Sequence, residues 1–264
     1  DSMIAALDKK DSKYYEKMQK IIEDHAIEAS ICKVLGSEAL AFCADEGVQI
    51  FGGAGFIEEY PVASFYRDER INRIFEGTNE INRLIIAGTL LKKAILEELP
   101  IRDQIYHREE EWVPKLTLSD DHELSTEISV IETSRSLMLY ILHELILKYG
   151  QDLKNEQWVL EPLADIVISL SVMQMGFTRY NQLEDGNHKN KMNQVVRYSI
   201  YKNFNILKDR INILIPYIYD DLDLKDKTDK INSRINELSY NPDSIAMKKS
   251  ICEELYKNGK YYLG

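Results

Sequence analysis

The sequence predicts an all-α protein built from two helical bundles in series. Apolar residues recur every three or four positions through most of the chain, which is the spacing of one face of an α-helix. No segment of useful length alternates apolar and polar residues in the way that a half-buried strand does. Glycines, prolines and acidic runs interrupt the helical pattern at a few places, so we expect helices joined by short connections.

The first helical stretch covers residues 11–43. Its apolar stripe consists of Tyr15, Met18, Ile22, His25, Ala29, Cys32, Gly36, Ala39 and Cys43. This spacing predicts one long helix whose stripe packs in a bundle. His25 falls on the stripe, where a hydrogen-bonded histidine in the core or at an interface is favoured over a ligand.

Two breaks divide the helical pattern that follows. Gly52, Gly53 and Gly55 form the first break and leave backbone N–H groups uncovered. The second break lies at Glu76 and Gly77, where a carboxylate stands next to a glycine-hinged turn. A carboxylate beside free N–H groups at a helix start suits general-base chemistry on a carbonyl compound.

Three helices are expected around these breaks. Pro61 suits the first turn of a short helix. Residues 65–75 carry charges, most of which we expect on a solvated, salt-bridged face: Arg67, Asp68, Glu69, Arg70 and Arg73. A further helix runs from Asn79 to Leu99, and Thr78 or Asn79 can cap its start.

The composition changes after residue 98, where prolines and a run of glutamates indicate a linker. We therefore divide the chain into a helical domain at 1–98, a linker at 99–119 and a helical bundle at 120–264. The bundle contains four helical blocks, of which the first ends at Gly150. The second covers residues 156–183 and the third covers 189–219. Asn241-Pro242-Asp243 interrupts the last block, so two shorter helices are expected there.

Charge and cysteine content narrow the class of protein. The net charge is −11 and 29 % of residues are charged, which makes nucleic acid an unlikely partner. Cys32, Cys43 and Cys252 are far apart and are expected to be buried thiols in a reducing compartment. No apolar run approaches transmembrane length by inspection, and no signal-like segment opens the chain. A cytoplasmic protein is therefore expected.

One stretch closely resembles the C-terminal helical domain of acyl-CoA dehydrogenases. The resemblance lies in Gln49-Ile50-Phe51-Gly52-Gly53, Glu59-Tyr60-Pro61-Val62, Tyr66-Arg67-Asp68, Arg70-Ile71 and Ile74-Phe75-Glu76-Gly77-Thr78-Asn79-Glu80-Ile81-Asn82-Arg83. It covers roughly residues 1–98. The later helices are similar in layout to the extension of the very-long-chain branch of that family. Because the family has two domains before this region, we expect the chain to be a piece of a longer protein.

The resemblance implies a reaction and the residues that carry it. A family member removes two hydrogens from a fatty acyl-CoA thioester with FAD as the oxidant, in fatty acid β-oxidation. Glu76 matches the family's catalytic base, and its backbone N–H matches a donor to the thioester oxygen. The matches to the cofactor-binding segments are Gln49, Gly52, Gly53, Thr78, Asn79 and Glu80, the first three of which often meet the adenosine-diphosphate half of FAD across a subunit contact.

The resemblance also implies substrate contacts and partners. Phe75 and Gly77 match the substrate side of the motif, although Phe75 and Tyr60 taken alone are more often core aromatics. Acyl-CoA, an electron-transfer flavoprotein and further copies of the chain in a homodimer or tetramer are the implied partners. The isolated piece is expected to be inactive. The basic stretch near Lys189, Lys191 and Arg197 is modest, which disfavours membrane contact.

One alternative class of function stays open, and a second class finds no support in the sequence. A non-catalytic helical module for oligomerisation or interaction, with the same fold, is the alternative to an enzyme. A metal site is not expected, because the five histidines show no Glu-x-x-His pair of the di-iron type. Asp185-Gly186-Asn187-His188 is a single, weak exception.

Overall fold

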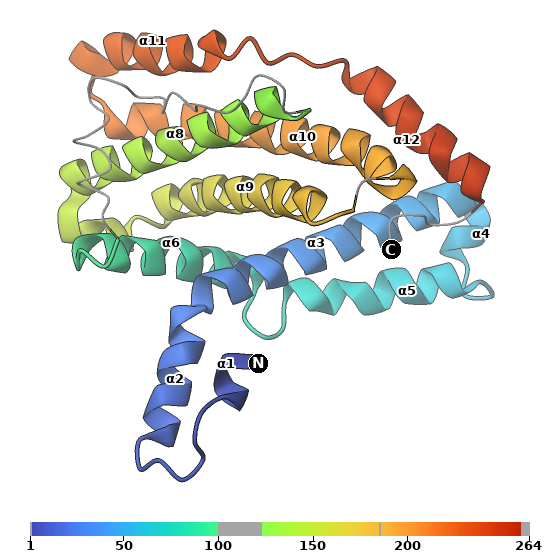
Figure 1. Cartoon of the computed structure of the whole chain (residues 1–264), viewed down its shortest axis with the longest axis horizontal. Helices are drawn as coiled ribbons and strands as arrows, with labels where there is room; N and C mark the ends of the chain where they lie inside the picture. Colours follow the sequence, from blue (N-terminus) through green and yellow to red (C-terminus); the bar gives the residue numbers. More distant parts are fainter. Residues whose placement is uncertain (1, 100–122, 185, 260–264) are drawn as a thin grey trace. The chain divides into compact units, whose positions relative to one another are not determined.

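The computed structural model describes residues 2–99, 123–184 and 186–259, and these ranges contain helices and no strand (Figure 1). The all-α prediction is therefore confirmed. The chain divides into two compact units, Asp1–Lys93 and Ala94–Gly264. Most of the predicted linker at 99–119 lies outside the described residues.

The first unit is built from short helices packed on one long helix. Its elements are α1 Ser2–Ala5, α2 Tyr14–Asp24, α3 Ala26–Phe51, α4 Gly53–Phe56, α5 Pro61–Glu69, the 3-10 helix η1 Arg70–Arg73, and α6 Asn79–Ile95, which runs two residues past the unit's end. Pro61 opens α5 as predicted, and Tyr60 before it is extended, as a residue that precedes proline prefers to be. α5 and η1 both pack on α3, and this packing sets the position of the loop that follows η1.

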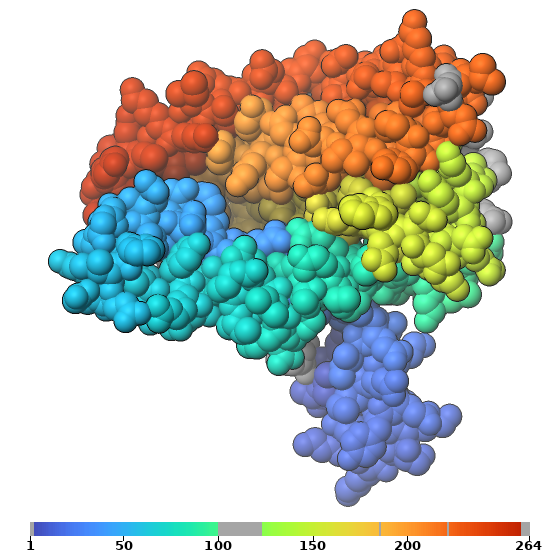
Figure 2. Space-filling model, turned by 180° about the vertical axis from the view of Figure 1, so that it is seen from behind, coloured from blue at the N-terminus to red at the C-terminus, as the bar shows by residue number. Residues whose placement is uncertain are grey.

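The long helix predicted at 11–43 is interrupted at His25. The imidazole Nδ1 donates a hydrogen bond of 2.8 Å to the carbonyl oxygen of Ile21 and so satisfies a backbone acceptor at the end of α2. His25 is hydrogen-bonded as expected, but it is exposed, which makes its placement in the core wrong. No residue of α2 is buried, and α2 stands clear of the helices that follow it in the same unit (Figures 1 and 2).

α3 buries a different face from the one predicted. Its buried residues are Ser30, Ile31, Val34, Ser37 and Ala41, whereas Cys32, Gly36, Ala39 and Cys43 of the predicted stripe are exposed. α3 carries small or apolar residues around nearly its whole circumference, so spacing alone could not select the buried face. The expectation of buried thiols is wrong as well, because Cys32, Cys43 and Cys252 are all exposed.

The second unit is a helical bundle with its own core. Its described helices are α8 Ser125–Tyr149, the 3-10 helix η2 Gly150–Asn155, α9 Gln157–Asn181, α10 Asn187–Ile218, α11 Asp221–Glu237 and α12 Ser244–Asn258. α8, α9 and α10 lie side by side, and α12 packs on α10 (Figure 1). The buried stripe of α10 follows the 3-4 spacing of its sequence: Val196, Ile200, Phe204, Leu207, Ile211, Leu214 and Ile218.

These helices end where the sequence has helix-breaking glycine and proline residues. α8 ends at Gly150, whose φ of 53° is easily reached by glycine. The break at Asn241-Pro242-Asp243 separates α11 from α12, as predicted. Asp243 caps α12, because its Oδ1 accepts hydrogen bonds from the backbone N–H groups of Ile245 at 3.1 Å and Ala246 at 2.9 Å.

α9 is the one described helix that is long and apolar enough to cross a membrane by length and composition. The sequence expectation that no run approaches that length is therefore wrong for α9. However, 67 % of its most apolar window is buried inside the fold. Core helices of globular bundles have the same composition, and α9 packs against both α8 and α10 as such a helix does.

Candidate functional site

The Glu76 turn connects η1 to α6 and has an unusual backbone. Glu76 has a φ of 55° and Gly77 a φ of 79°, so two consecutive residues adopt left-handed conformations. Glycine does this freely, but for a side-chain-bearing residue the left-handed region costs roughly 1–2 kcal/mol. A strained glutamate in the resembled motif is the kind of outlier that is found at functional sites. Glu76 is exposed, so its carboxylate is accessible.

The residues after the turn fix the start of α6. Thr78 caps the helix, because its Oγ1 accepts a hydrogen bond of 3.2 Å from the backbone N–H of Ile81. This confirms Thr78 as the cap. The Glu80 carboxylate accepts hydrogen bonds from its own backbone N–H and from the Thr78 hydroxyl, and these bonds lower the Glu80 pKa.

Two asparagines beside the turn are buried. The Asn82 Nδ2 donates hydrogen bonds to the carbonyl oxygens of Gly77 at 2.8 Å and Thr78 at 3.0 Å. The Asn79 side chain is 3 % exposed, and both its amide oxygen and its amide nitrogen are hydrogen-bonded to residues of α3. Asn79 Nδ2 donates to Ser37 Oγ at 3.0 Å and to Glu38 Oε1 at 3.2 Å.

The apolar residues before the turn lie open to solvent. Phe75 is 46 % exposed, and Ile71 and Ile74 are exposed to a similar degree. Phe75 therefore has little support from packing within the described residues and is accessible to a ligand. Tyr60 is also exposed, but it lies before α5, whereas the Glu76 turn follows η1.

One charged residue of this segment departs from its predicted environment. Glu69 is 3 % exposed, so it is the exception to the solvated face expected for most of these charges. Its Oε1 lies 3.3 Å from Nη2 of Arg73, one helical turn later. The ion pair offsets part of the desolvation of the carboxylate, although Glu69 Oε2 and Arg73 Nε have no partner among the described residues.

The glycine break lies at the C-terminal end of α3. Gln49, Gly52 and Gly53 are all exposed. Gly52 has a φ of 59°, so glycine there serves the turn itself. Gly53 has no positive φ, and a Cβ added to it would meet nothing within 4 Å. Nothing within the described chain thus requires glycine at position 53.

The structure does not bring the two groups of predicted residues together. Asn79 contacts α3 at Ser37, and the stretch of α3 from Ser37 to Gly52 rises roughly 20 Å at 1.5 Å per residue. The glycine break precedes α5, whereas the Glu76 turn follows η1, so the helical segment 61–73 separates them (Figure 1).

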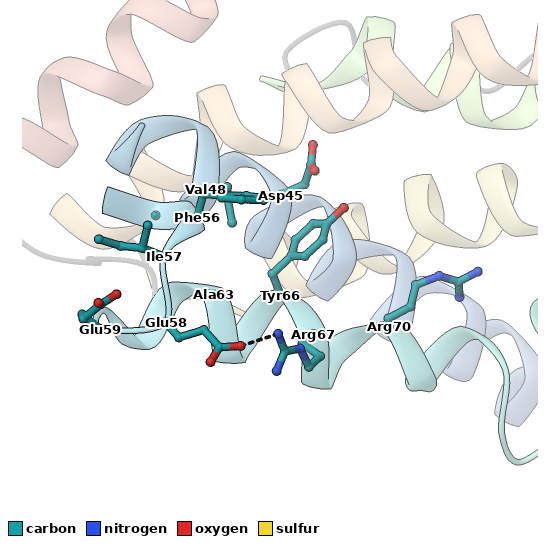
Figure 3. A pocket seen from close by; sticks show the side chains of 11 residues that line it. Asp45, Val48, Phe56, Ile57, Glu58, Glu59, Ala63, Tyr66, Arg67 and Arg70 are labelled. Carbon is teal, nitrogen blue, oxygen red and sulfur yellow. Dashed lines mark hydrogen bonds and ion pairs between the residues drawn. The ribbon is translucent and has the colours of Figure 1, made fainter. Parts of the chain in front are cut away.

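A hollow of about 950 Å³ adjoins the glycine break. Asp45 and Val48 of α3 line it from one side, and Tyr66 of α5 and Arg70 of η1 from another, with α4 and the segment after it completing the wall (Figure 3). At its rim Arg67 Nη2 donates a hydrogen bond of 2.7 Å to Glu58 Oε1. Sequence reasoning missed this hollow, because its residues come from separate elements and share no motif.

Metal-ligating residues do not gather in the described part of the chain. No group of three or more His, Cys, Asp or Glu side chains in residues 2–99, 123–184 and 186–259 is arranged to hold a metal ion. The Glu76 turn itself offers an exposed carboxylate beside the Glu76 N–H, which has no hydrogen-bond partner among the described residues.

Comparisons with known proteins place similar sequences and one similar structure in a single family. Residues 11–91 match the family model described as the acyl-CoA dehydrogenase C-terminal domain. A probable acyl-CoA dehydrogenase of Bacillus subtilis is 39 % identical over 199 residues, which cover 75 % of this chain and 33 % of the relative. The mitochondrial very long-chain specific acyl-CoA dehydrogenase of Bos taurus is 34 % identical over 175 residues, which cover 59 % of this chain and 27 % of the relative.

A solved structure extends the likeness to almost the whole chain. The crystal structure of an acyl-CoA dehydrogenase complexed with FAD from Bacillus anthracis matches with a TM-score of 0.86 and 30 % identity. The match covers 99 % of this chain and 45 % of the other chain. This chain thus spans about a third of the length of the first curated relatives. It belongs to the acyl-CoA dehydrogenase family, and residues 11–91 match the C-terminal domain of that family.

Proposed function

We propose that this chain supplies the C-terminal part of an FAD-dependent acyl-CoA dehydrogenase in which Glu76 is the catalytic base. Glu76 removes a proton from the carbon next to the thioester carbonyl of a fatty acyl-CoA. The observation that carries the proposal is the Glu76 turn, where an exposed carboxylate is held on a left-handed backbone inside the family's matching domain. Such a base contributes on the order of 10²–10⁴-fold to the rate.

The backbone of the turn supports the second requirement of this chemistry. Removal of a proton beside a carbonyl places negative charge on the carbonyl oxygen, which must be stabilised by hydrogen-bond donors. The N–H of Glu76 has no hydrogen-bond partner among the described residues. It is free to donate to the thioester oxygen while the carboxylate of the same residue takes the proton.

The exposed residues fit a bound FAD. Gly53 leaves uncovered backbone that no packing within the described chain explains, and Gln49 beside it offers an exposed amide. These residues and Gly52 would hold the adenosine-diphosphate half, whereas Thr78 and Glu80 lie beside the reacting centre. When bound, FAD supplies the acceptor for the hydride that leaves the β-carbon. Phe75 and Gly77 would line the substrate side of the turn.

The separation of the two groups supports a homodimer or tetramer. A single chain holds them at opposite ends of the α5–η1 segment, so we propose that different copies serve the two halves of one FAD. The exposed face of α3 agrees, since a helix that is apolar all round is normally covered. Leu40, Phe42 and Ile50 are exposed on α3. An electron-transfer flavoprotein as electron acceptor is proposed on family membership alone.

The test uses the longest native protein that contains this chain. Acyl-CoAs of graded length are added anaerobically, and bleaching of the flavin spectrum is followed. Glu76→Gln should abolish the bleaching while FAD stays bound. Glu97→Gln is the matched control, because Glu97 is also an exposed glutamate with a left-handed φ of 57° but lies outside the motif. Turnover that survives Glu76→Gln would overturn the assignment of the base.

A non-catalytic oligomerisation module of the same fold is the second candidate. The exposed apolar face of α3 favours it, because this face needs a partner whether or not chemistry follows. Absence of bound FAD in the longest native protein, together with stable self-association, would favour this module over the enzyme. For the isolated 264 residues we expect no dehydrogenation of acyl-CoA.

A further inference from the structure

We infer that Asn82 is the positioning residue of the Glu76 turn. Its buried amide holds the two carbonyls that follow Glu76 and thereby fixes the backbone from which the carboxylate projects. The catalytic consequence rests on the proposed function, whereas the structural role of Asn82 can be tested without it.

The geometry gives each amide hydrogen of Asn82 a carbonyl oxygen. Nδ2 lies 2.8 Å from the oxygen of Gly77 and 3.0 Å from that of Thr78. Asn82 is 7 % exposed, so water has little access to compete for these bonds. Both carbonyls belong to peptide units directly after the left-handed pair.

Helix α6 alone does not satisfy the Gly77 carbonyl. In a regular α-helix the N–H four residues later, that of Ile81, would donate to it. The Ile81 N–H instead donates to Thr78 Oγ1 at 3.2 Å. Asn82 supplies the missing donor through its side chain, while its own backbone N–H donates to the Thr78 carbonyl at 2.9 Å.

The turn is confined on its other sides as well. A Cβ added to Gly77 would lie 3.2 Å from Asn82 Nδ2, so the close approach of the amide depends on glycine at this position. Asn79, the first residue of α6, is hydrogen-bonded to Lys33 and Ser37 of α3. The turn is thus fixed between α3 and the Asn82 amide.

Removal of the Asn82 donors releases Glu76 from a conformation that its own side chain disfavours. The turn then samples other conformations, and the carboxylate is aligned for proton removal in only a fraction of them. Displacements of this kind lower kcat, because proton transfer depends on close alignment, and affect binding less.

The first test follows amide hydrogen exchange in the 264-residue chain without cofactor or substrate. Asn82→Leu removes the donors in a side chain of similar size, and Asn82→Gln keeps an amide on a longer stem in case Asn82→Leu does not fold. Within residues 75–81 the amides of Phe75 and Ile81 are hydrogen-bonded, to the Ile71 carbonyl and to Thr78 Oγ1. Their exchange should accelerate at least about tenfold in Asn82→Leu, with a smaller change in Asn82→Gln. Unchanged exchange there in a folded variant would overturn the inference.

A matched control is available in the second unit. The Nδ2 of Asn203 in α10 donates to the Ser199 carbonyl at 2.8 Å, the same bond between an asparagine amide and a carbonyl four residues earlier. Asn203→Leu should leave the exchange of residues 75–81 unchanged. Acceleration there in Asn203→Leu would show a global loss of stability instead of a local role and would contradict the inference.

The second test measures kinetics in the longest native protein that contains this chain. Asn82→Leu should lower kcat roughly tenfold and leave KM within about twofold. In a Glu76→Gln background the same substitution should cause no further loss. A rise in KM with unchanged kcat, or an equal loss in both backgrounds, contradicts the role in positioning Glu76. Absence of acyl-CoA oxidation in the unsubstituted protein would refute the proposed function, and hydrogen exchange would still decide the role of Asn82.

Discussion

The ammonium group of Lys33 on α3 donates a hydrogen bond of 2.7 Å to Oδ1 of Asn79 at the start of α6. The Asn79 amide nitrogen donates in turn to Ser37 and Glu38, and Glu38 forms a salt bridge of 2.8 Å with Arg83. The side chain of Asn79 therefore joins two helices of the first unit. Both amide hydrogens of Asn79 are used within the chain, so the side chain has no donor left for FAD. The predicted contact of Asn79 with FAD therefore stays a prediction for its backbone.

Replacement of Asn79 by alanine should reduce stability before it affects the cofactor. Asn79→Ala removes the buried hydrogen-bond partner of Lys33 and the amide bonds to Ser37 and Glu38, although Ser37 Oγ still donates to the Val34 carbonyl at 3.1 Å. This loss should lower the free energy of unfolding by about 1–3 kcal/mol. Urea unfolding of the 264-residue chain measures this. Asn72→Ala is the control, because Asn72 is half-buried and makes one bond of 3.0 Å to the Glu69 carbonyl. Unchanged unfolding of Asn79→Ala, with weaker FAD binding in the longest native protein, would assign the side chain to FAD instead.

The helix ends could be predicted from the sequence because they depend on local chemistry. Pro61 cannot donate a backbone hydrogen bond and so begins α5, and Gly150 reaches a positive φ at the end of α8. The 3-4 spacing of α10 also located its buried face, because its opposite face is polar. In these places one residue or one periodic pattern is sufficient to predict the helix end or the buried face.

The buried face of α3 and the details of the Glu76 turn could not be predicted in this way. α3 is apolar or small on several faces, so the choice between Val34 and Cys32 as core depends on which helices pack against it. The motif located Glu76, but its left-handed backbone results from the surrounding contacts. The role of Asn82 arises because the Ile81 N–H donates to Thr78 Oγ1 and leaves the Gly77 carbonyl to the Asn82 amide. No rule of residue spacing indicates this exchange of partners.

Glycine at position 76 should stabilise the chain while it removes activity. Glu76 occupies a left-handed conformation that glycine adopts without strain, so Glu76→Gly should raise the free energy of unfolding by up to about 1 kcal/mol. Glu80→Gly is the matched control: Glu80 lies in the first turn of α6, where glycine should lower stability by roughly 0.5–1 kcal/mol. Urea midpoints of the two variants should move in opposite directions. A lower midpoint for Glu76→Gly would show that the turn is not strained.

Two glycines of the resembled motif should separate folding from cofactor binding. Gly77 has a φ of 79° and contacts Asn82, so Gly77→Ala should destabilise the chain by roughly 1–2 kcal/mol. Gly53 lies in open space without a positive φ, so Gly53→Ala should change stability by less than about 0.5 kcal/mol. If FAD approaches this backbone, Gly53→Ala should still weaken FAD binding about tenfold, or ~1.4 kcal/mol. Urea unfolding and FAD titration of the longest native protein measure the two effects, and unchanged FAD affinity would exclude close approach at Gly53.

The core of the second unit should lose stability at alkaline pH through Tyr219. This residue is 8 % exposed and donates a hydrogen bond of 3.0 Å to the Tyr140 hydroxyl; burial first, and then this bond, raise the Tyr219 pKa. A tyrosine in the unfolded chain ionises near pH 10, whereas folded Tyr219 keeps its proton, so its contribution is complete below pH 10 and declines above it. Tyr219→Phe should lower the free energy of unfolding at pH 7 by about 1 kcal/mol.

The difference between wild type and Tyr219→Phe should then shrink above pH 10, because only the wild type loses stability through this group. The decline is at most about 1.4 kcal/mol per pH unit. Urea unfolding of the 264-residue chain at pH 7, 10 and 11 measures it. Tyr256→Phe removes a hydroxyl from a side chain that is 83 % exposed and should leave the pH 7 midpoint unchanged. A constant difference between wild type and Tyr219→Phe from pH 7 to 11 would mean that Tyr219 ionises as readily in the folded chain as in the unfolded one.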